Sequence, residues 1–211
     1  MILANRAEAG ELLAGKLLAY TDKDTVVYAL PRGGVIVGAV IARKLKTPLE
    51  VIIARKIGHP LQPEFGIAAV TEGGHLIKNE KYAATVDENW FSVEIERQKT
   101  AAQHRRNLYR PALRGISAKD KVAILTDDGV ATGLTTKAAI SDLREQQPQK
   151  IILAVPVIPA DTAKELAQLI DEVVVLDTPE DFAGAVGAYY EEFPQVNDEE
   201  VIHELKAVNR L

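Results

Sequence analysis

Short apolar runs alternate with amphipathic stretches along most of the chain. The apolar runs are nearly continuous and rich in β-branched residues, which is typical of strands that are covered on both faces. They predict strands at residues 25–31, 49–57, 67–71, 75–79, 121–128, 150–158 and 172–178. Stretches of helical character predict helices at residues 35–46, 87–110, 134–146 and 161–170. A surface helix near the N-terminus is also predicted, with Asn5 as its N-cap and Glu8 three residues later.

The alternation of strands and helices predicts an α/β fold, with a doubly wound, mainly parallel central sheet and helices on both faces. Right-handed crossovers restrict the topology to doubly wound strand orders. In such sheets, ligands bind beyond the carboxyl ends of the strands, near the point where the strand order reverses. Two predicted strands end in glycine-bearing loops, ALPRGG at residues 29–34 and TDDGVATG at residues 126–133. We expect these two loops to flank the binding crevice.

A long polar interval separates the early strands from the TDDG strand. Residues 58–66 form a polar, proline-bearing loop. The helix predicted at residues 87–110 carries only a thin apolar stripe of Phe91, Ile95 and Ala102. Such a stripe predicts a helix that is only partly packed against the rest of the protein.

Composition narrows the classes of function. The chain has 211 residues, of which 47% are hydrophobic and 26% charged, and we interpret residues 1–211 as a single globular domain. The net charge of −5 argues against an extended nucleic-acid surface. The absence of cysteine excludes disulfides and thiolate chemistry, and the four histidines lack the spacing of a zinc site. The chain has no apolar stretch that could span a bilayer and no signal-peptide pattern, so we expect a cytoplasmic protein without membrane contact.

Two adjacent carboxylates close the strand predicted at residues 121–128. Side chains alternate along a strand, so Asp127 and Asp128 would face opposite sides of the sheet if the strand continued. Neither side of a covered parallel sheet favours a free carboxylate. We therefore expect the strand to end there, with both acids projecting at its carboxyl end. Such a pair can accept hydrogen bonds from two neighbouring hydroxyls, such as a ribose diol.

Small residues follow the acids and lead into the helix predicted at residues 134–146. They allow backbone N–H groups to converge on an anion, the helix N-terminus adds its dipole, and Thr132, Thr135 and Thr136 add hydroxyl donors. Acids and loop together predict a ribose 5-phosphate site. The alternative is an Asp-Gly turn with a threonine N-cap. The chain has no G-x-x-x-x-G-K-[ST] and no G-x-G-x-x-G after its first strand, which argues against a P-loop nucleotide site and a dinucleotide site.

The segment ILTDDGVATGLTT, residues 124–136, resembles the phosphoribosyl pyrophosphate (PRPP) signature of type I phosphoribosyltransferases. Both have apolar residues, two acids and a small-residue loop that ends in threonine. Thr126 and Gly129 depart from the commonest form, in which these positions are apolar. LPRGGVIVG resembles the family's pyrophosphate loop, and the whole chain resembles a group of predicted phosphoribosyltransferases with no established acceptor. The resemblance implies a type I phosphoribosyltransferase-like fold with a small hood and a flexible loop.

The resemblance also implies roles for individual residues. Asp127 and Asp128 would hold the ribose hydroxyls, take part in catalysis and approach the metal indirectly, through PRPP. Ribose and 5-phosphate would also contact the residues after the acids: Gly129, Val130, Ala131, Thr132, Gly133, Leu134 and Thr135. Pyrophosphate would contact a second set of residues: Arg32, Gly33, Gly34, Arg55 and Lys56. Arg32 and Lys56 are also candidate catalytic residues. Because side chains alternate on a strand, we expect only one of Arg55 and Lys56 to face the site; a pair of exposed surface bases is the alternative.

A lid and a hood would complete such a site. The interval 58–110 is expected to contain a lid that excludes water, and its basic residues are either phosphate ligands or part of a solvated helix face. Residues 178–211 are expected to form a C-terminal hood or cap segment. Val157, Phe182 and Tyr189 are candidate acceptor contacts, although aromatic side chains could equally cap the core.

The resemblance implies an enzyme of nucleotide metabolism that binds Mg²⁺ and PRPP. It would transfer 5-phosphoribose to a nitrogenous, nucleobase-like acceptor and release pyrophosphate, with Mg²⁺ held chiefly by substrate oxygens and water. The implied partners are PRPP, a small-molecule acceptor and further copies of the chain, with no nucleic acid. A protein that senses PRPP without transferase activity is the alternative, because fold and motif do not separate the two. Hydrolysis of PRPP, or transfer to an unusual small molecule, is a third possibility.

Overall fold

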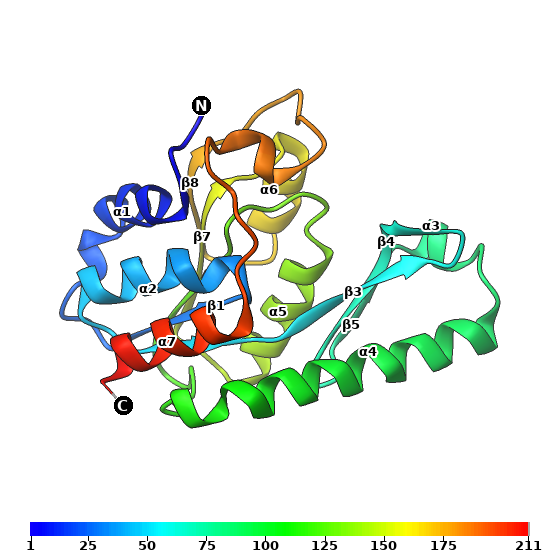
Figure 1. The fold of residues 1–211 in the computed structure, drawn as a ribbon, viewed down its shortest axis with the longest axis horizontal. Helices are drawn as coiled ribbons and strands as arrows, with labels where there is room; N and C mark the ends of the chain where they lie inside the picture. The colour runs from blue at the N-terminus through cyan, green and yellow to red at the C-terminus, as the bar shows by residue number, and fades with distance from the viewer. Residues whose placement is uncertain (211) are drawn as a thin grey trace.

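A five-stranded parallel sheet forms the centre of the structure, a computed structural model that describes residues 1–210 (Figure 1). In spatial order its strands are β2 (Leu49–Val51), β1 (Thr25–Ala29), β6 (Val122–Thr126), β7 (Lys150–Val157) and β8 (Glu172–Asp177). The strand order reverses between β1 and β6, as in doubly wound sheets. The fold class predicted from the sequence is therefore confirmed.

Helices cover both faces of this sheet (Figure 1). In chain order they are α1 (Arg6–Lys16), α2 (Gly33–Leu45), α5 (Leu134–Glu145), α6 (Ala160–Ala167) and α7 (Asp198–Asn209). Val27 and Ile124 point into the core beneath α1, α2 and α7, whereas Val26 and Leu125 point into the core beneath α5 and α6. All residues of β1 and β6 are buried, which explains why both strands are almost continuously apolar.

A second, antiparallel sheet extends from the central sheet as an arm (Figure 1). It consists of β3 (Ala54–His59), β4 (Gln62–Thr71) and β5 (Leu76–Lys78), together with α3 (Glu80–Ala83) and α4 (Glu88–Tyr109). Phe91 of α4 packs with Ile57 and Ile67 of the arm sheet. Phe91 and Ala102 are buried while much of α4 is exposed, so the prediction of a partly packed helix is confirmed.

The prediction of a single strand at residues 49–57 is wrong. β2 ends at Val51, and β3 begins at Ala54 in the other sheet. At this junction the Ile53 N–H donates to the Glu72 carboxylate over 2.7 Å, and the Glu72 N–H donates to the Ile53 carbonyl over 3.0 Å. These bonds hold the chain where it leaves the central sheet. The apolar sequence continues through the junction, so its pattern carried no sign of the change.

Two further segments differ from the prediction. The loop at residues 58–66 is largely strand, because β3 and β4 form a hairpin that turns at residues 60–61. α7 was not predicted, although Asn197 and Glu200 form a capping box at its start. α7 packs into the main core, so only the earlier part of the segment 178–211 could act as a hood; Leu211 lies outside the described residues. Residues 1–210 also contain three 3₁₀ turns: η1 (Leu18–Tyr20), η2 (Arg110–Ala112) and η3 (Val186–Tyr189).

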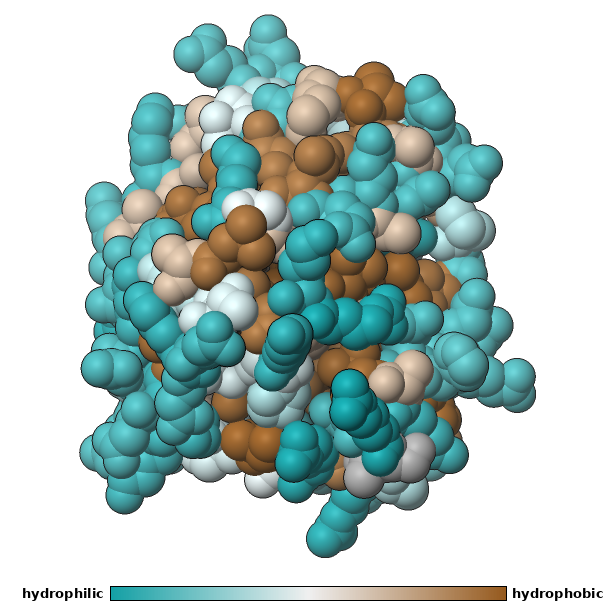
Figure 2. Space-filling model, turned by 90° about the vertical axis from the view of Figure 1, so that its left-hand side faces the viewer, coloured by the Kyte–Doolittle hydropathy of each residue, from teal (hydrophilic) through white to brown (hydrophobic). Residues whose placement is uncertain are grey.

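The surface mixes charged and apolar residues. On the side that carries α1, apolar side chains lie between charged ones (Figure 2). Leu12 and Leu18 in this region are 45% and 53% exposed. Among residues 1–210, none of the helices combines the length and apolar character that crossing a bilayer would require.

Candidate functional site

The loops that follow β1 and β6 start side by side. Ala29 and Thr126, the last residues of these strands, are partners in the parallel register. The Leu30 N–H donates to the Thr126 carbonyl over 2.9 Å, which extends the pairing by one step. The glycine-bearing loops predicted to flank a crevice therefore meet at the point where the strand order reverses.

Asp127 is the first residue after β6. Its Oδ1 accepts a 2.8 Å hydrogen bond from the Asp128 N–H. The start of α2 lies directly against it, since a Cβ on Gly34 would be 2.9 Å from both Asp127 Cα and Oδ1. Burial, followed by the neighbouring charge of Asp128, raises the pKa of Asp127 well above its usual range. A cation or hydrogen-bond donors that bind beside Asp127 would favour its ionised form, in which the carboxylate only accepts hydrogen bonds.

Asp128 forms an ion pair that sequence analysis missed. Its Oδ2 accepts a 2.7 Å hydrogen bond from Arg6 Nε, and the two side chains are only 16% and 9% exposed. The Tyr190 hydroxyl donates to the Asp128 carbonyl over 2.6 Å. A Cβ on Gly33 would lie 1.8 Å from Asp128 Oδ2, so this carboxylate rests directly on a glycine.

One oxygen of each carboxylate is left for a ligand. Asp127 Oδ1 and Asp128 Oδ2 are committed to protein donors. Within residues 1–210, Asp127 Oδ2 and Asp128 Oδ1 have no donor from outside the pair, and neither is among the fully enclosed unpaired atoms. The acid pair, Asp127 and Asp128, thus presents two neighbouring acceptor oxygens, the number that two adjacent hydroxyls require.

The signature loop, residues 129–135, provides donors beside the acid pair. Its flanks are paired: the Val130 N–H donates to the Val157 carbonyl over 2.9 Å, and the Lys137 N–H to the Gly133 carbonyl over 2.8 Å. Between them, the N–H groups of residues 131–136 have no acceptor anywhere in residues 1–210. Gly133 has φ of 72° and precedes the first residue of α5, where the helix dipole favours an anion. Thr132 is exposed, whereas Thr136 is 1% exposed and is not available to a ligand.

A second group of donors lies at the start of α2. The helix begins at Gly33, and the N–H groups of Gly33 and Gly34 lack an acceptor in the described part of the chain. Arg32 precedes the helix, is half-buried, and has no ion-pair partner among residues 1–210. The peptide bond between Pro31 and Arg32 is cis. The start of α2 therefore lies against the acid pair, and the start of α5 follows the pair along the chain; both are helix N-termini, which favour anions.

The structure moves Arg55 and Lys56 into the arm. They lie in β3 rather than at the end of a central strand. Arg55 Nε donates to Gln98 Oε1 over 2.6 Å, and burial lowers the pKa of its guanidinium. Lys56 Nζ lies 3.1 Å from the Glu64 carboxylate and is largely exposed. No hydrogen bond or ion pair joins either base to the acid pair within residues 1–210, so their contact with pyrophosphate stays a prediction.

The candidate acceptor residues belong to a small apolar cluster. Val157 is 1% exposed and Tyr189 is 8% exposed. Phe182 stacks on Tyr189 with 5.3 Å between ring centres, and Leu3 completes this part of the cluster. The cluster covers Gly129, where a Cβ would lie 2.4 Å from a Val186 methyl. In this arrangement Val157 and Tyr189 cap the core, and only Phe182 is accessible enough to contact an acceptor.

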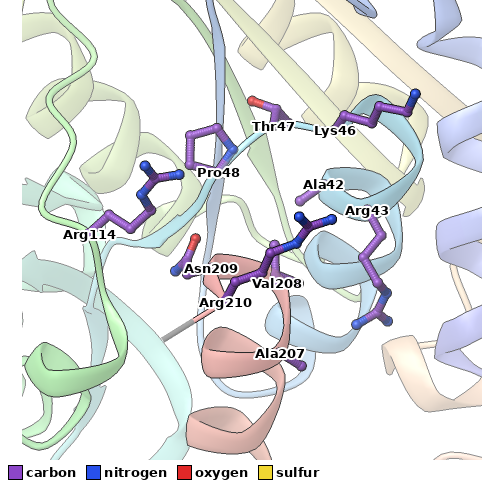
Figure 3. Close-up of a pocket in the computed structure, with 10 residues that line it drawn as sticks. All are labelled: Ala42, Arg43, Lys46, Thr47, Pro48, Arg114, Ala207, Val208, Asn209 and Arg210. Carbon is purple, nitrogen blue, oxygen red and sulfur yellow. The ribbon is translucent and has the colours of Figure 1, made fainter.

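A cavity of about 570 Å³ lies at the other end of the sheet. It is lined by the ends of α2 and α7 and by residues 46–48, which precede β2, so it lies at the amino ends of the strands. Figure 3 shows that its basic side chains point in different directions: Arg43, Lys46, Arg114 and Arg210. Because these charges do not converge, this cavity is a weaker candidate than the acid pair.

Comparison with known proteins gives a consistent family. Residues 1–193 match the family model described as "Phosphoribosyl transferase domain". A Mycobacterium tuberculosis protein with the provisional name phosphoribosyl transferase is 39% identical over 213 residues, a match that covers 98% of this chain and 47% of that protein. The chain thus spans about half the length of this relative.

Solved structures agree with the sequence matches. The protein TT1426 from Thermus thermophilus is 39% identical and superposes with a TM-score of 0.80, covering 97% of this chain and 98% of that one. The AQ2163 protein from Aquifex aeolicus is 12% identical with a TM-score of 0.50, covering 85% and 78% of the two chains. The second similarity concerns the fold alone.

Proposed function

We propose that this chain, which belongs to the phosphoribosyl transferase domain family, binds PRPP with Mg²⁺. It would then transfer the 5-phosphoribosyl group to a nitrogenous acceptor. One observation carries the proposal. Asp127 and Asp128 each keep one free carboxylate oxygen, the start of α2 lies against both residues, and the chain after them leads to the start of α5; N–H groups at both helix starts lack an acceptor within residues 1–210. A sugar diol with a phosphate on one side and a pyrophosphate on the other matches this order of acceptors and donors.

Each part of the donor would then have its own place. The 5-phosphate would bind the N–H groups of residues 131–135 at the start of α5. The 2- and 3-hydroxyls would donate to the acid pair. The pyrophosphate would bind the N–H groups of Gly33 and Gly34, with the charge of Arg32 beside it.

The acid pair also suits a magnesium ion that arrives with the substrate. Mg²⁺ prefers carboxylate and phosphate oxygens and keeps several waters. Asp127 and Asp128 offer such oxygens, while no group of three or more His, Asp or Glu side chains in the described chain could hold a metal by itself. When bound, Mg²⁺ would offset the negative charge of pyrophosphate. The protein would therefore contribute to a shared site rather than form a complete one.

In the reaction, the acceptor nitrogen would form a bond to C1 of the ribose while the bond from C1 to the pyrophosphate oxygen breaks. Positive charge grows on the sugar and the acceptor loses a proton. Positioning of the reactants and stabilisation of the departing pyrophosphate are the contributions expected from the protein. Arg32 and the start of α2 would perform the second task.

Water must be kept from C1, and we assign this task to the arm. A cavity of about 400 Å³ lies between the arm and the signature loop, beside the contact of Leu134 with Ala69 of β4, and is lined by Phe65, Lys78 and Tyr82 on one side and by Thr132 and Leu134 on the other. Closure of the arm over this cavity would cover the 5-phosphate end of the site. The lid proposed for residues 58–110 would then consist of the arm sheet and α4.

A PRPP-binding regulator is the second candidate, and one observation favours it. Val157 and Tyr189, predicted acceptor contacts, are packed in the core and expose little surface to an acceptor. The two functions separate in a screen for PRPP-dependent pyrophosphate release over bases and amines, with a control that lacks acceptor. Release above the control with one acceptor supports the transferase. Release without acceptor indicates hydrolysis, and tight PRPP binding without release indicates the regulator.

A further inference from the structure

Arg6 is the one basic side chain that forms an ion pair with the acid pair in the described chain. It is the first residue of α1, where the positive end of the helix dipole disfavours a cation. A buried arginine in this position therefore does not stabilise α1. Its stabilisation must come from its partners outside α1.

Three partners hold the guanidinium from different sides. Nε donates to Asp128 Oδ2 over 2.7 Å, and Nη1 donates to the Pro194 carbonyl over 2.8 Å. The guanidinium carbon lies 3.7 Å from the centre of the Phe193 ring, the geometry of a cation–π contact. A planar group fixed in this way cannot turn without losing at least one contact, so it fixes the direction of the Asp128 carboxylate as well.

The partners of Arg6 outside the acid pair belong to one segment, the strap, residues 189–194. The strap pairs with the start of the chain: the Leu3 N–H donates to the Tyr189 carbonyl, and the Glu191 N–H to the Leu3 carbonyl. The Tyr190 hydroxyl donates to the Asp128 carbonyl. The N-terminus, the strap and Asp128 therefore form one connected unit, with Arg6 at its centre.

We propose that Arg6 is a positioning residue of the donor site, which turns Asp128 so that its second oxygen faces the ribose diol and which couples the strap to donor binding. The proposal rests on the proposed function, since it needs a sugar diol at the acid pair. Arg6 itself would not contact the donor. It would act through Asp128 and through the strap.

Removal of Arg6 has two opposing effects on donor binding. It frees Asp128 Oδ2, which adds an acceptor for hydroxyls. It also leaves two adjacent carboxylates without a counter-charge beside a highly anionic donor, and it releases the direction of the carboxylate. The second effect should dominate, because like charges at short range repel and an unfixed acceptor must be ordered when the ligand binds.

Calorimetric titration with Mg·PRPP tests this on four proteins: wild type, Arg6→Met, Arg6→Lys and Arg43→Met. Arg43 is the matched control, because it is a helical arginine with a carboxylate partner at 2.7 Å, on Glu204, away from the site. Arg6→Met should weaken binding roughly ten- to a hundredfold, the effect of one charge-assisted hydrogen bond. Arg6→Lys, which keeps the charge without the planar fork, should recover part of this loss. Arg43→Met should bind as wild type does.

A double-mutant cycle with Asp128→Asn separates positioning from general stabilisation. If Arg6 acts through Asp128, Arg6→Met should weaken binding much less in the Asp128→Asn background than in wild type. Equal losses in both backgrounds would overturn the proposal, and so would wild-type affinity in a folded Arg6→Met variant. Should Arg6→Met not fold, Phe193→Leu replaces it, because this variant keeps the ion pair between Arg6 and Asp128. Phe193→Leu should weaken Mg·PRPP binding severalfold. Wild-type affinity in Phe193→Leu would overturn the coupling of the strap to donor binding. Failure of wild type to bind Mg·PRPP would refute the proposed function itself, a result distinct from these.

Discussion

Gly33→Ala should displace the Asp128 carboxylate from its position against residue 33. A Cβ at this position would lie 1.8 Å from Asp128 Oδ2, 2.5 Å from its Cγ and 2.8 Å from Arg6 Nε. Cβ contacts under 3.0 Å essentially do not occur in proteins, so the carboxylate must rotate or α2 must shift. Either movement breaks the 2.7 Å ion pair between Arg6 and Asp128.

The expected change in the free energy of unfolding combines the loss of a charge-assisted hydrogen bond with the gain from replacing glycine in a helix. A hydrogen bond to a charged group contributes about 1.5–3 kcal/mol to stability. Alanine in place of glycine within a helix contributes roughly 0.5–1 kcal/mol in the opposite direction, and less at the first position of α2. The free energy of unfolding should therefore fall by roughly 1–2.5 kcal/mol. Affinity for Mg·PRPP should fall about tenfold or more, because the acceptor oxygen of Asp128 no longer faces the diol.

Urea unfolding and calorimetric titration measure both effects. Gly15→Ala is the matched control, since Gly15 lies in α1 and its added Cβ would meet nothing within 4 Å. This control should be slightly more stable than wild type and should bind Mg·PRPP equally well. A Gly33→Ala protein with wild-type stability and affinity would refute the placement of Asp128 against Gly33.

Three further variants test Glu72 at the junction of the two sheets, Gly133 in the signature loop, and Arg32. Burial raises the pKa of Glu72 to about 7, so the folded protein binds this proton more tightly than the unfolded chain and loses stability as pH rises from about 4.5 to 7. Glu72→Gln should therefore add up to about 3 kcal/mol in urea unfolding at pH 8, and much less at pH 5. Gly133→Val should abolish sulfate binding at the start of α5 in crystals, because the added atoms meet Thr162 at 2.9 Å and φ is 72°; sulfate retained there would contradict the loop assignment. Arg32→Ala should lower kcat more than it lowers PRPP affinity; equal losses would show that Arg32 contributes uniform binding instead.

The elements that sequence analysis predicted well have local signals. The strand that became β6 is continuously apolar and ends in two carboxylates, a pattern that neither face of a covered sheet permits in its interior. The small residues up to Gly133 likewise mark the loop before α5. The carboxyl ends of β1 and β6 could then be paired from topology alone.

The parts that sequence analysis missed depend on contacts distant in the chain. Arg6 lies 122 positions from Asp128, and an arginine at the start of a helix gives no local sign of a buried partner. The change of sheet after Val51 depends on Glu72, which also lies beyond the local window. α7 is different, because its capping box of Asn197 and Glu200 was present in the sequence and could have been recognised.

We propose that the acid pair receives the ribose diol of PRPP. Calorimetric titration of wild type and Asp127→Asn with Mg·PRPP tests it most directly. In Asp127→Asn the amide oxygen can still accept from the Asp128 N–H, so the fold should remain and thermal stability should not fall, while an N–H donor replaces the free acceptor oxygen. Wild type should bind, and Asp127→Asn should bind roughly tenfold or more weakly. Absence of binding by wild type, or equal affinity in the two proteins, would contradict the proposal.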